Sequence, residues 1–104
     1  MDKAPRPIKR LTTLLTSGNL WLYILSLISK EGELYAYALD ERIEKDFSFR
    51  PNKIMVYIVL YKLEGEGLIA SKFVERRKYY KLTDEGRKTL QRAREYFKTL
   101  SERL

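Results

Sequence analysis

The stretch PNKIMVYIVLYKLEGEGLIASKFVERRKYYKL, residues 51–82, changes from a helical pattern to a strand pattern and decides the fold. Apolar residues recur at spacings of three and four from residue 53 to about residue 66, which predicts a helix. Strand-like residues follow at 68–74 and 77–82, and the polar pair Glu75-Arg76 between them predicts the tip of a β-hairpin. A helix followed directly by a two-stranded wing is typical of a winged helix-turn-helix.

The periods of these elements predict which side chains face the core. Within the predicted helix, Val56, Leu60 and Leu63 form the inward stripe. Along the second strand, Tyr80 and Leu82 point inward, because successive side chains of a strand alternate between its two faces.

Two further helices are predicted before this stretch. Residues 20–28 are apolar almost all round, so they form a buried helix that needs partners on several sides, one of which a second subunit could supply. Residues 34–47 have helical periodicity and a charged outer face, on which Arg42 and Asp46 lie one turn apart. The basic, proline-containing residues 1–10 predict a flexible arm.

The last segment is predicted to be a dimerisation helix. Thr83 can cap its start, and Asp84 and Glu85 complement the helix dipole. Its apolar residues form a narrow seam that continues to the end of the sequence, as in a coiled-coil contact. This seam and the start of the helix at 20–28 give the predicted dimer interface: Leu20, Trp21, Leu90, Ala93, Phe97, Leu100 and Leu104.

The predicted fold class is therefore mainly α with a small β-hairpin (α+β), a winged helix-turn-helix with a C-terminal dimerisation helix. The 104 residues are enough for one hydrophobic core. We expect a basic flexible arm at 1–10, the winged helix-turn-helix domain at 11–82 and the dimerisation helix at 83–104.

The composition limits the classes of function. There are 21 Lys and Arg against 14 Asp and Glu, and a net charge of +7 attracts polyanions such as nucleic acid. The sequence has no Cys and no His, which removes thiol chemistry, disulfides and the commonest metal ligand and general base. Asp40 and Glu44 share a helix face, but no third metal ligand is evident and basic neighbours favour salt bridges. We predict no enzyme, no cofactor and no metal. The longest apolar run, residues 20–28, is too short for a membrane span, so we expect a cytoplasmic protein.

Basic residues gather at the start of the helix predicted from residue 53 and along the hairpin. In this arrangement the helix can enter a major groove while the hairpin lies on the adjacent DNA backbone. Tyr57 and Tyr61 lie one turn apart on the outer face, where they could contact phosphate, sugar or a thymine methyl group. For Tyr61, packing of the ring against the wing is the alternative. The predicted DNA-binding residues are Arg50, Asn52, Lys53, Tyr57, Tyr61, Lys72, Arg76, Arg77 and Lys78.

The same part of the sequence resembles a known family. The run VYIVLYKLEGEGLI, residues 56–69, resembles the tyrosine-bearing recognition helix of the PadR family, which ends in Glu-x-Glu-Gly-Leu. The run RKYYKLTDEG, residues 77–86, is similar to that family's second wing strand and the start of its dimer helix. The resemblance implies a homodimeric transcription regulator, usually a repressor, whose third helix and wing face DNA. Some members also bind aromatic or cationic small molecules near the dimer interface.

Three features depart from the family pattern. Tyr35-Ala36 stands where His-Gly is frequent, so local packing is expected to differ there. Tyr61 stands where a basic residue is common, which leaves fewer phosphate contacts from the helix. The wing tip lacks a glycine-rich extension, which argues against deep insertion into a groove.

Two other functions stay open on the sequence alone. Winged helices also serve as protein–protein interaction modules, and Ile54, Met55 and Ile58 would suit that use. The basic hairpin would also suit a non-specific nucleic-acid-binding protein. For the regulator, the expected partners are near-palindromic double-stranded DNA and a second copy of the chain.

Aromatic residues near the predicted interface raise the question of an effector. Trp21 and Tyr23 on the first buried helix, with Tyr96 and Phe97 on the last, could line a pocket for a small aromatic or cationic molecule. The alternative that we favour is that these side chains form the interface core.

Overall fold

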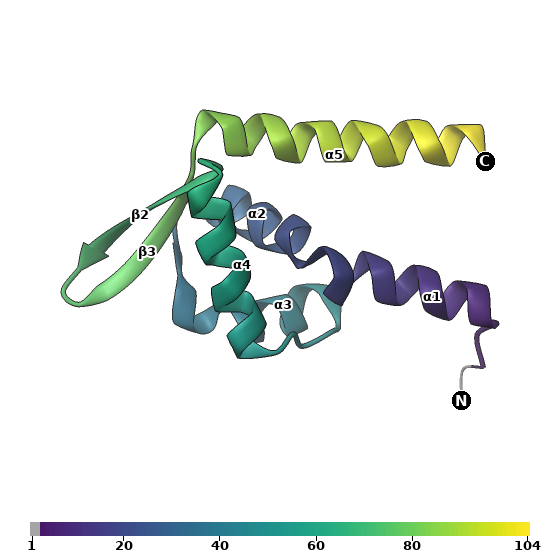
Figure 1. Ribbon diagram of the computed structural model, residues 1–104, viewed down its shortest axis with the longest axis horizontal. Helices are drawn as coiled ribbons and strands as arrows, with labels where there is room; N and C mark the ends of the chain where they lie inside the picture. Colours follow the sequence, from purple (N-terminus) through teal and green to yellow (C-terminus); the bar gives the residue numbers. More distant parts are fainter. Residues whose placement is uncertain (1–2) are drawn as a thin grey trace.

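The structure is a computed structural model that describes residues 3–104. Its elements follow in the order α1 (Arg6–Leu15), η1 (Ser17–Asn19), α2 (Leu20–Glu31), β1 (Leu34–Tyr35), η2 (Ala36–Ala38), α3 (Leu39–Phe47), α4 (Lys53–Gly65), β2 (Ile69–Val74), β3 (Arg77–Leu82) and α5 (Asp84–Arg103), where η marks a 3-10 helix. The wing formed by β2 and β3 projects from one side of the body, while α1 and α5 extend toward the opposite side (Figure 1). The predicted winged-helix order is therefore confirmed in α2, α3, α4, the wing and α5.

The hydrophobic core lies around α2. This helix contacts α3, α4, α5 and β3, so much of the packing that its apolar surface requires comes from within the chain. The predicted inward stripe of α4 is also buried, with Val56, Leu60 and Leu63 at most 4% exposed. These contacts fix α4 in one orientation on the body, and they determine which of its faces is open to a partner.

Two residues of the predicted dimer interface belong to this core instead. Leu20 at the start of α2 is 4% exposed, and Leu90 in the first half of α5 is 3% exposed. The apolar seam of α5 begins by packing on α2 of the same chain, so the prediction is wrong for these two residues. The apolar spacing of a helix is the same whether it packs on its own chain or on a second subunit, so the sequence alone does not separate the two cases.

The sheet has one strand more than the predicted hairpin. β1 pairs antiparallel with β3, so that Leu34 lies opposite Tyr80, and the strand order is β1-β3-β2. The prediction of one helix over 34–47 is therefore wrong for residues 34–38, and α3 begins at Leu39. The free edge of β3 offers hydrogen-bonding groups to this segment, and a local helical period does not reveal that edge.

The starts of α4 and α5 follow from capping residues. The Asn52 side chain accepts a hydrogen bond from the Ile54 backbone N–H at 2.8 Å, which satisfies a free donor of the first turn of α4. Thr83 caps α5 as predicted, since its hydroxyl accepts from the Gly86 N–H at 3.0 Å. The Leu68 carbonyl passes so close to Gly86 that a Cβ there would clash with its oxygen. This contact holds the start of α5 against the base of the wing.

The wing closes in a turn centred on Glu75 and Arg76. Both residues have positive φ angles, 51° and 72° respectively. The two-residue hairpin turn that best matches the twist of the strands requires positive φ at both central residues. Glycine adopts positive φ more easily than Glu75 and Arg76 do. The tip is as short and polar as the sequence predicts, and it presents Arg76 to solvent.

The N-terminal segment differs from the predicted flexible arm. α1 begins at Arg6, so residues 6–10 are helical, and Pro7 lies in the first turn, where its missing N–H costs no helical hydrogen bond. Residues 1 and 2 of that arm lie outside the described residues. The Tyr23 hydroxyl donates to the Leu15 carbonyl and ties the end of α1 to α2. α1 has no buried residue, and its exposed apolar side chains are Ile8, Leu11 and Leu14.

By length and composition alone, the helical run Arg6–Glu31 could cross a membrane. It is not one regular α-helix, because η1 separates α1 from α2. Several of the apolar residues of α2 are buried against the rest of the chain. We therefore attribute the hydropathy of this run to the core helix α2.

Candidate nucleic-acid interface

The exposed face of α4 is apolar and aromatic. Ile54, Ile58 and Tyr61 follow one another at spacings of four and three and form a stripe opposite the buried side of the helix. Their exposed fractions are 70%, 41% and 80% respectively, and Met55 and Tyr57 beside them are exposed as well. Because Tyr61 is so exposed, the alternative in which its ring is buried against the wing is wrong.

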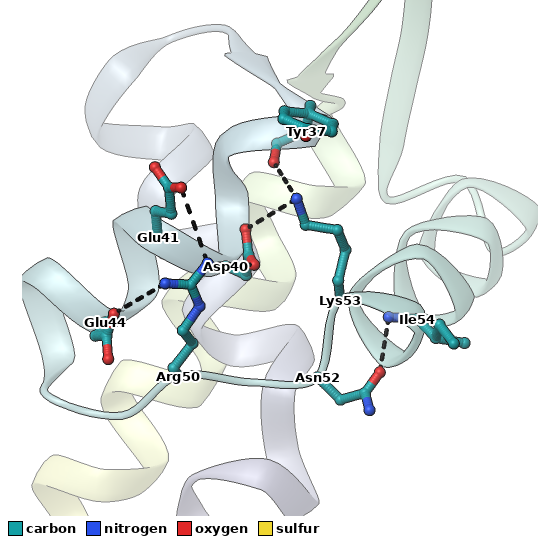
Figure 2. A network of polar contacts seen from close by, with 8 residues as sticks. All are labelled: Tyr37, Asp40, Glu41, Glu44, Arg50, Asn52, Lys53 and Ile54. Atoms are coloured by element: carbon teal, nitrogen blue, oxygen red, sulfur yellow. Dashed lines mark hydrogen bonds and ion pairs between the residues drawn. The ribbon is translucent and has the colours of Figure 1, made fainter.

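Arg50, in the turn before α4, lies among three carboxylates of α3 (Figure 2). Its guanidinium nitrogens are 3.1 Å from Asp40 Oδ2, 3.8 Å from Glu41 Oε1 and 3.3 Å from Glu44 Oε1. The hydrogen bond to Asp40 raises the pKa of Arg50 above its ordinary value. Asp40 is 4% exposed and needs a cation, so Arg50 balances charge within the protomer and fixes the turn between α3 and α4. A contact of Arg50 with DNA stays a prediction.

Lys53 and Asn52 are also engaged at the start of α4 (Figure 2). Lys53 Nζ is 3.8 Å from Asp40 Oδ1, donates to the Tyr37 carbonyl oxygen at 3.4 Å and lies 3.7 Å from the centroid of the Tyr37 ring. The Oδ1 atom of Asn52 is occupied by its capping bond to Ile54. The three predicted residues at this end of α4 therefore lie close together, and each has a partner within the chain.

The basic residues of the wing divide into paired and unpaired. Lys72 Nζ is 3.5 Å from Glu33 Oε1, and Lys78 Nζ is 3.6 Å from Glu64 Oε1. Within residues 3–104, no ion pair reaches Arg76 or Arg77, although the Arg77 guanidinium lies 5.3 Å from the centroid of the Tyr35 ring. The two arginines next to the wing tip therefore keep an uncompensated charge.

A recess of about 280 Å³ lies between α4 and the base of the wing. The predicted residues Tyr57, Tyr61 and Lys78 line it, so the structure brings them together. Tyr35 and Tyr37, from β1 and η2, complete the aromatic wall with their rings stacked at 6.0 Å. Sequence analysis did not select these two tyrosines as site residues. The helical period of this segment hid the pairing of Tyr35 with β3, and with it the position of both rings at the recess.

A larger cavity of about 550 Å³ lies between the start of α2 and α5. Trp21, Tyr96 and Phe97 line it, whereas Tyr23 faces a different cavity, in which its ring packs edge-on against Phe47 at 4.8 Å. Three of the four aromatic residues predicted to lie around an effector thus share one cavity. Among the described residues, no group of three His, Cys, Asp or Glu side chains could hold a metal ion.

The rest of the α5 seam is open to solvent. Phe97 is 37% exposed, Leu100 is 41% exposed and Leu104 is 96% exposed, while Ala93 is half-buried. Phe97 lies beside residues of α2, and the end of α5 extends past α2 in Figure 1. The outer half of the predicted seam is therefore free to contact a partner.

Comparison with known proteins places this fold in a family. Residues 24–92 match the sequence model of the transcriptional regulator PadR-like family. The structure is similar to a PadR family transcriptional regulator from Eggerthella lenta, with a TM-score of 0.76 and 27% identity over 91% of this chain and 86% of that one. It is similar in fold to F93 from STIV, a winged-helix DNA-binding protein, with a TM-score of 0.72 and 20% identity over 82% and 92% of the two chains.

The structure is also similar to Bacillus subtilis PadR, solved in complex with operator DNA, with a TM-score of 0.62 and 28% identity. That match covers 69% of this chain and 44% of the Bacillus protein. No curated protein matches the sequence. The family match covers most of the chain and includes α3, α4, the wing and the first half of α5. This chain belongs to the PadR-like family of transcriptional regulators, which are DNA-binding winged-helix proteins and not enzymes.

Proposed function

We propose that this protein is a cytoplasmic homodimeric repressor that binds a specific double-stranded operator. α4 lies in the major groove, and the wing lies on the adjacent backbone. The observation that carries this proposal is the exposed face of α4, with the unpaired Arg77 beside the recess between α4 and the wing and the unpaired Arg76 at the wing tip. Phosphate contacts from such a wing can orient the helix, and base contacts from the helix can supply sequence specificity. The operator complex of Bacillus subtilis PadR supports the choice of DNA as partner.

The homodimer rests on the uncovered half of α5. In the protomer, Phe97, Leu100 and Leu104 form an apolar strip on α5 that is exposed to solvent, and a second copy of α5 would bury this strip. We keep Ala93 and Trp21 in the proposed interface, because both lie at the cavity beside the strip. A two-fold dimer presents two α4 helices, so the operator is near-palindromic, with half-sites about 34–36 Å apart.

A second function has some support from the structure. Ile54, Met55 and Ile58 are exposed on α4, and an apolar helix face suits a protein partner. The free arginines of the adjacent wing and the family favour DNA. A protein–protein interaction module is therefore the second candidate.

The test is fluorescence anisotropy with labelled duplexes tiled from the region upstream of the gene, at low and near-physiological salt, beside a scrambled duplex. Tight, saturable binding to one tile that persists in added salt supports the sequence-specific regulator. Equal, salt-sensitive binding to every duplex supports a non-specific nucleic-acid-binding protein. Absence of binding at both salt concentrations supports the protein–protein interaction module.

An effector stays a prediction of the same proposal. The cavity around Trp21 contains aromatic side chains, and Trp21 is the single tryptophan of the sequence. Quenching of its fluorescence by planar cations, together with release of the operator, would support an effector site. Unchanged fluorescence across a varied panel would support interface packing alone.

A further inference from the structure

The stripe of α4 that faces away from the core contains few groups that can make base-specific hydrogen bonds. It consists of Ile54, Ile58 and Tyr61, followed one turn later by Gly65. The branched apolar side chain of Ile54 is 70% exposed near the start of the helix, the part that a helix-turn-helix usually presents to base edges. Apart from the Tyr61 hydroxyl, the stripe offers apolar surface.

The polar residues at the start of α4 are held by other groups. Asn side chains recognise adenine with both their amide oxygen and their amide nitrogen, but the Asn52 oxygen already accepts the Ile54 N–H at 2.8 Å. Lys and Arg recognise guanine, but Lys53 is held by Asp40 and Tyr37, and Arg50 is held by the carboxylates of α3. Figure 2 shows the Ile54 side chain directed away from Asp40 and Arg50, in agreement with its high exposure.

Thymine is the base that presents an apolar group, its C5-methyl, in the major groove. We propose that Ile54 and Ile58 read thymine methyl groups, so that the operator half-site is recognised chiefly by the positions of its thymines rather than by its guanines. This inference rests on the proposed binding of α4 in the major groove.

A DNA partner suits this apolar face because the face continues into a basic surface. Tyr61 lines the recess that also contains Lys78, and Arg77 lies beside the same recess through its contact with Tyr35. An apolar face next to the unpaired Arg77 is complementary to methyl groups flanked by phosphates. A protein partner with an apolar surface would offer no negative charge to the arginine, whereas DNA offers phosphates.

The experiment starts by selecting high-affinity duplexes from a random pool with the purified protein. Each thymine of the selected half-site is then replaced by uracil, which pairs as thymine does but lacks the methyl group. We expect each contacted methyl to cost about fourfold in affinity, the value of one buried carbon group. Replacement in both half-sites of a near-palindrome should cost roughly sixteenfold.

Two variants test whether Ile54 causes the loss of affinity when thymine is replaced by uracil. Ile54→Ala should weaken binding to the thymine operator and should abolish the difference between thymine and uracil at one position. Ile8→Ala, at an isoleucine of α1 that is 48% exposed, is the matched control and should keep the full difference. Circular dichroism melting should be unchanged for both variants, because both side chains lie at the surface.

The outcomes separate this inference from the proposed function. Tight binding to a selected duplex with no uracil effect, or with guanines as the only essential bases, would overturn thymine recognition and leave the regulator intact. An equal uracil effect in wild type and Ile54→Ala would overturn the assignment to α4. Failure to select any duplex would overturn the proposed DNA binding itself, and thymine recognition with it.

Discussion

Replacing Arg77 with alanine should lower the salt dependence of DNA binding, whereas replacing Arg50 with glutamine should leave it unchanged. Both residues are arginines in the predicted DNA-binding set. Arg50 is held by three carboxylates of α3, and Arg77 has no ion pair within the described residues. A phosphate releases counterions when an unpaired cation binds it, but an arginine that is already paired adds little positive charge to the interface.

The expected size follows from the number of unpaired cations. Each phosphate contact contributes about 0.9 to the slope of log K against log salt concentration, and a dimer has two copies of Arg77. The slope for Arg77→Ala should therefore be smaller by about 1.8. Between about 50 and 200 mM salt, the affinity of wild type should fall about tenfold more than that of the variant. If only Arg76 and Arg77 bind phosphates, the wild-type slope should be about −3.6, but about −11 if all six predicted basic residues do so.

The assay is fluorescence anisotropy on one operator duplex at several salt concentrations, with wild type, Arg77→Ala and Arg50→Gln. Thermal unfolding is recorded alongside. Arg50→Gln should lower the melting temperature, because the buried Asp40 loses a charged partner. The distinction between paired and unpaired arginines is refuted if both variants reduce the slope equally, or if Arg77→Ala leaves it unchanged.

Three shorter predictions concern the dimer and the fold. Phe97→Arg should give monomers in sedimentation velocity, because it places like charges at a two-fold contact, and an unaltered dimer would exclude the α5 seam. Gly86→Ala should lower the free energy of unfolding in urea by about 1–3 kcal/mol or more, because its Cβ would clash with the Leu68 carbonyl. Gly65→Ala, where the added Cβ meets nothing within 4 Å, is the control and should not show this loss. Burial raises the pKa of Tyr23 above its ordinary value of 10.0, so its contribution to stability is complete below that pH and is lost as the pH rises through the raised value. Tyr23→Phe should reduce the fall in melting temperature between about pH 9 and 11, and an identical fall would contradict it.

Much of the winged-helix body could be predicted because its signals are local. The buried stripe of α4, its capping by Asn52 and the short polar tip at Glu75 and Arg76 depend on residues a few positions apart. Helical spacing and strand alternation act within one element, so the sequence of that element is enough to show them. The capping of α5 by Thr83 is of the same kind.

What could not be predicted depends on partners far away in the sequence. Leu34 and Tyr35 form a strand because β3 lies beside them, more than 40 residues later. The apolar spacing that includes Leu90 is the same whether the helix packs on its own domain or on another copy, and here it packs on α2. Likewise, the position of Arg50 is visible in the sequence, but the carboxylates of α3 that balance its charge become visible only after folding.

The balance of charge at this surface bears on how specificity arises. A net charge of +7 suggests strong attraction to any duplex, yet four of the six basic residues in the predicted site are already paired. The sequence-independent part of the affinity should therefore be modest for so basic a protein. Among the predicted site residues, specific and non-specific binding would use the same two wing arginines, so the ratio of the two affinities should change little with salt. The apolar stripe of α4 would then determine the ratio of specific to non-specific affinity. Its contacts with base edges displace water and do not release counterions.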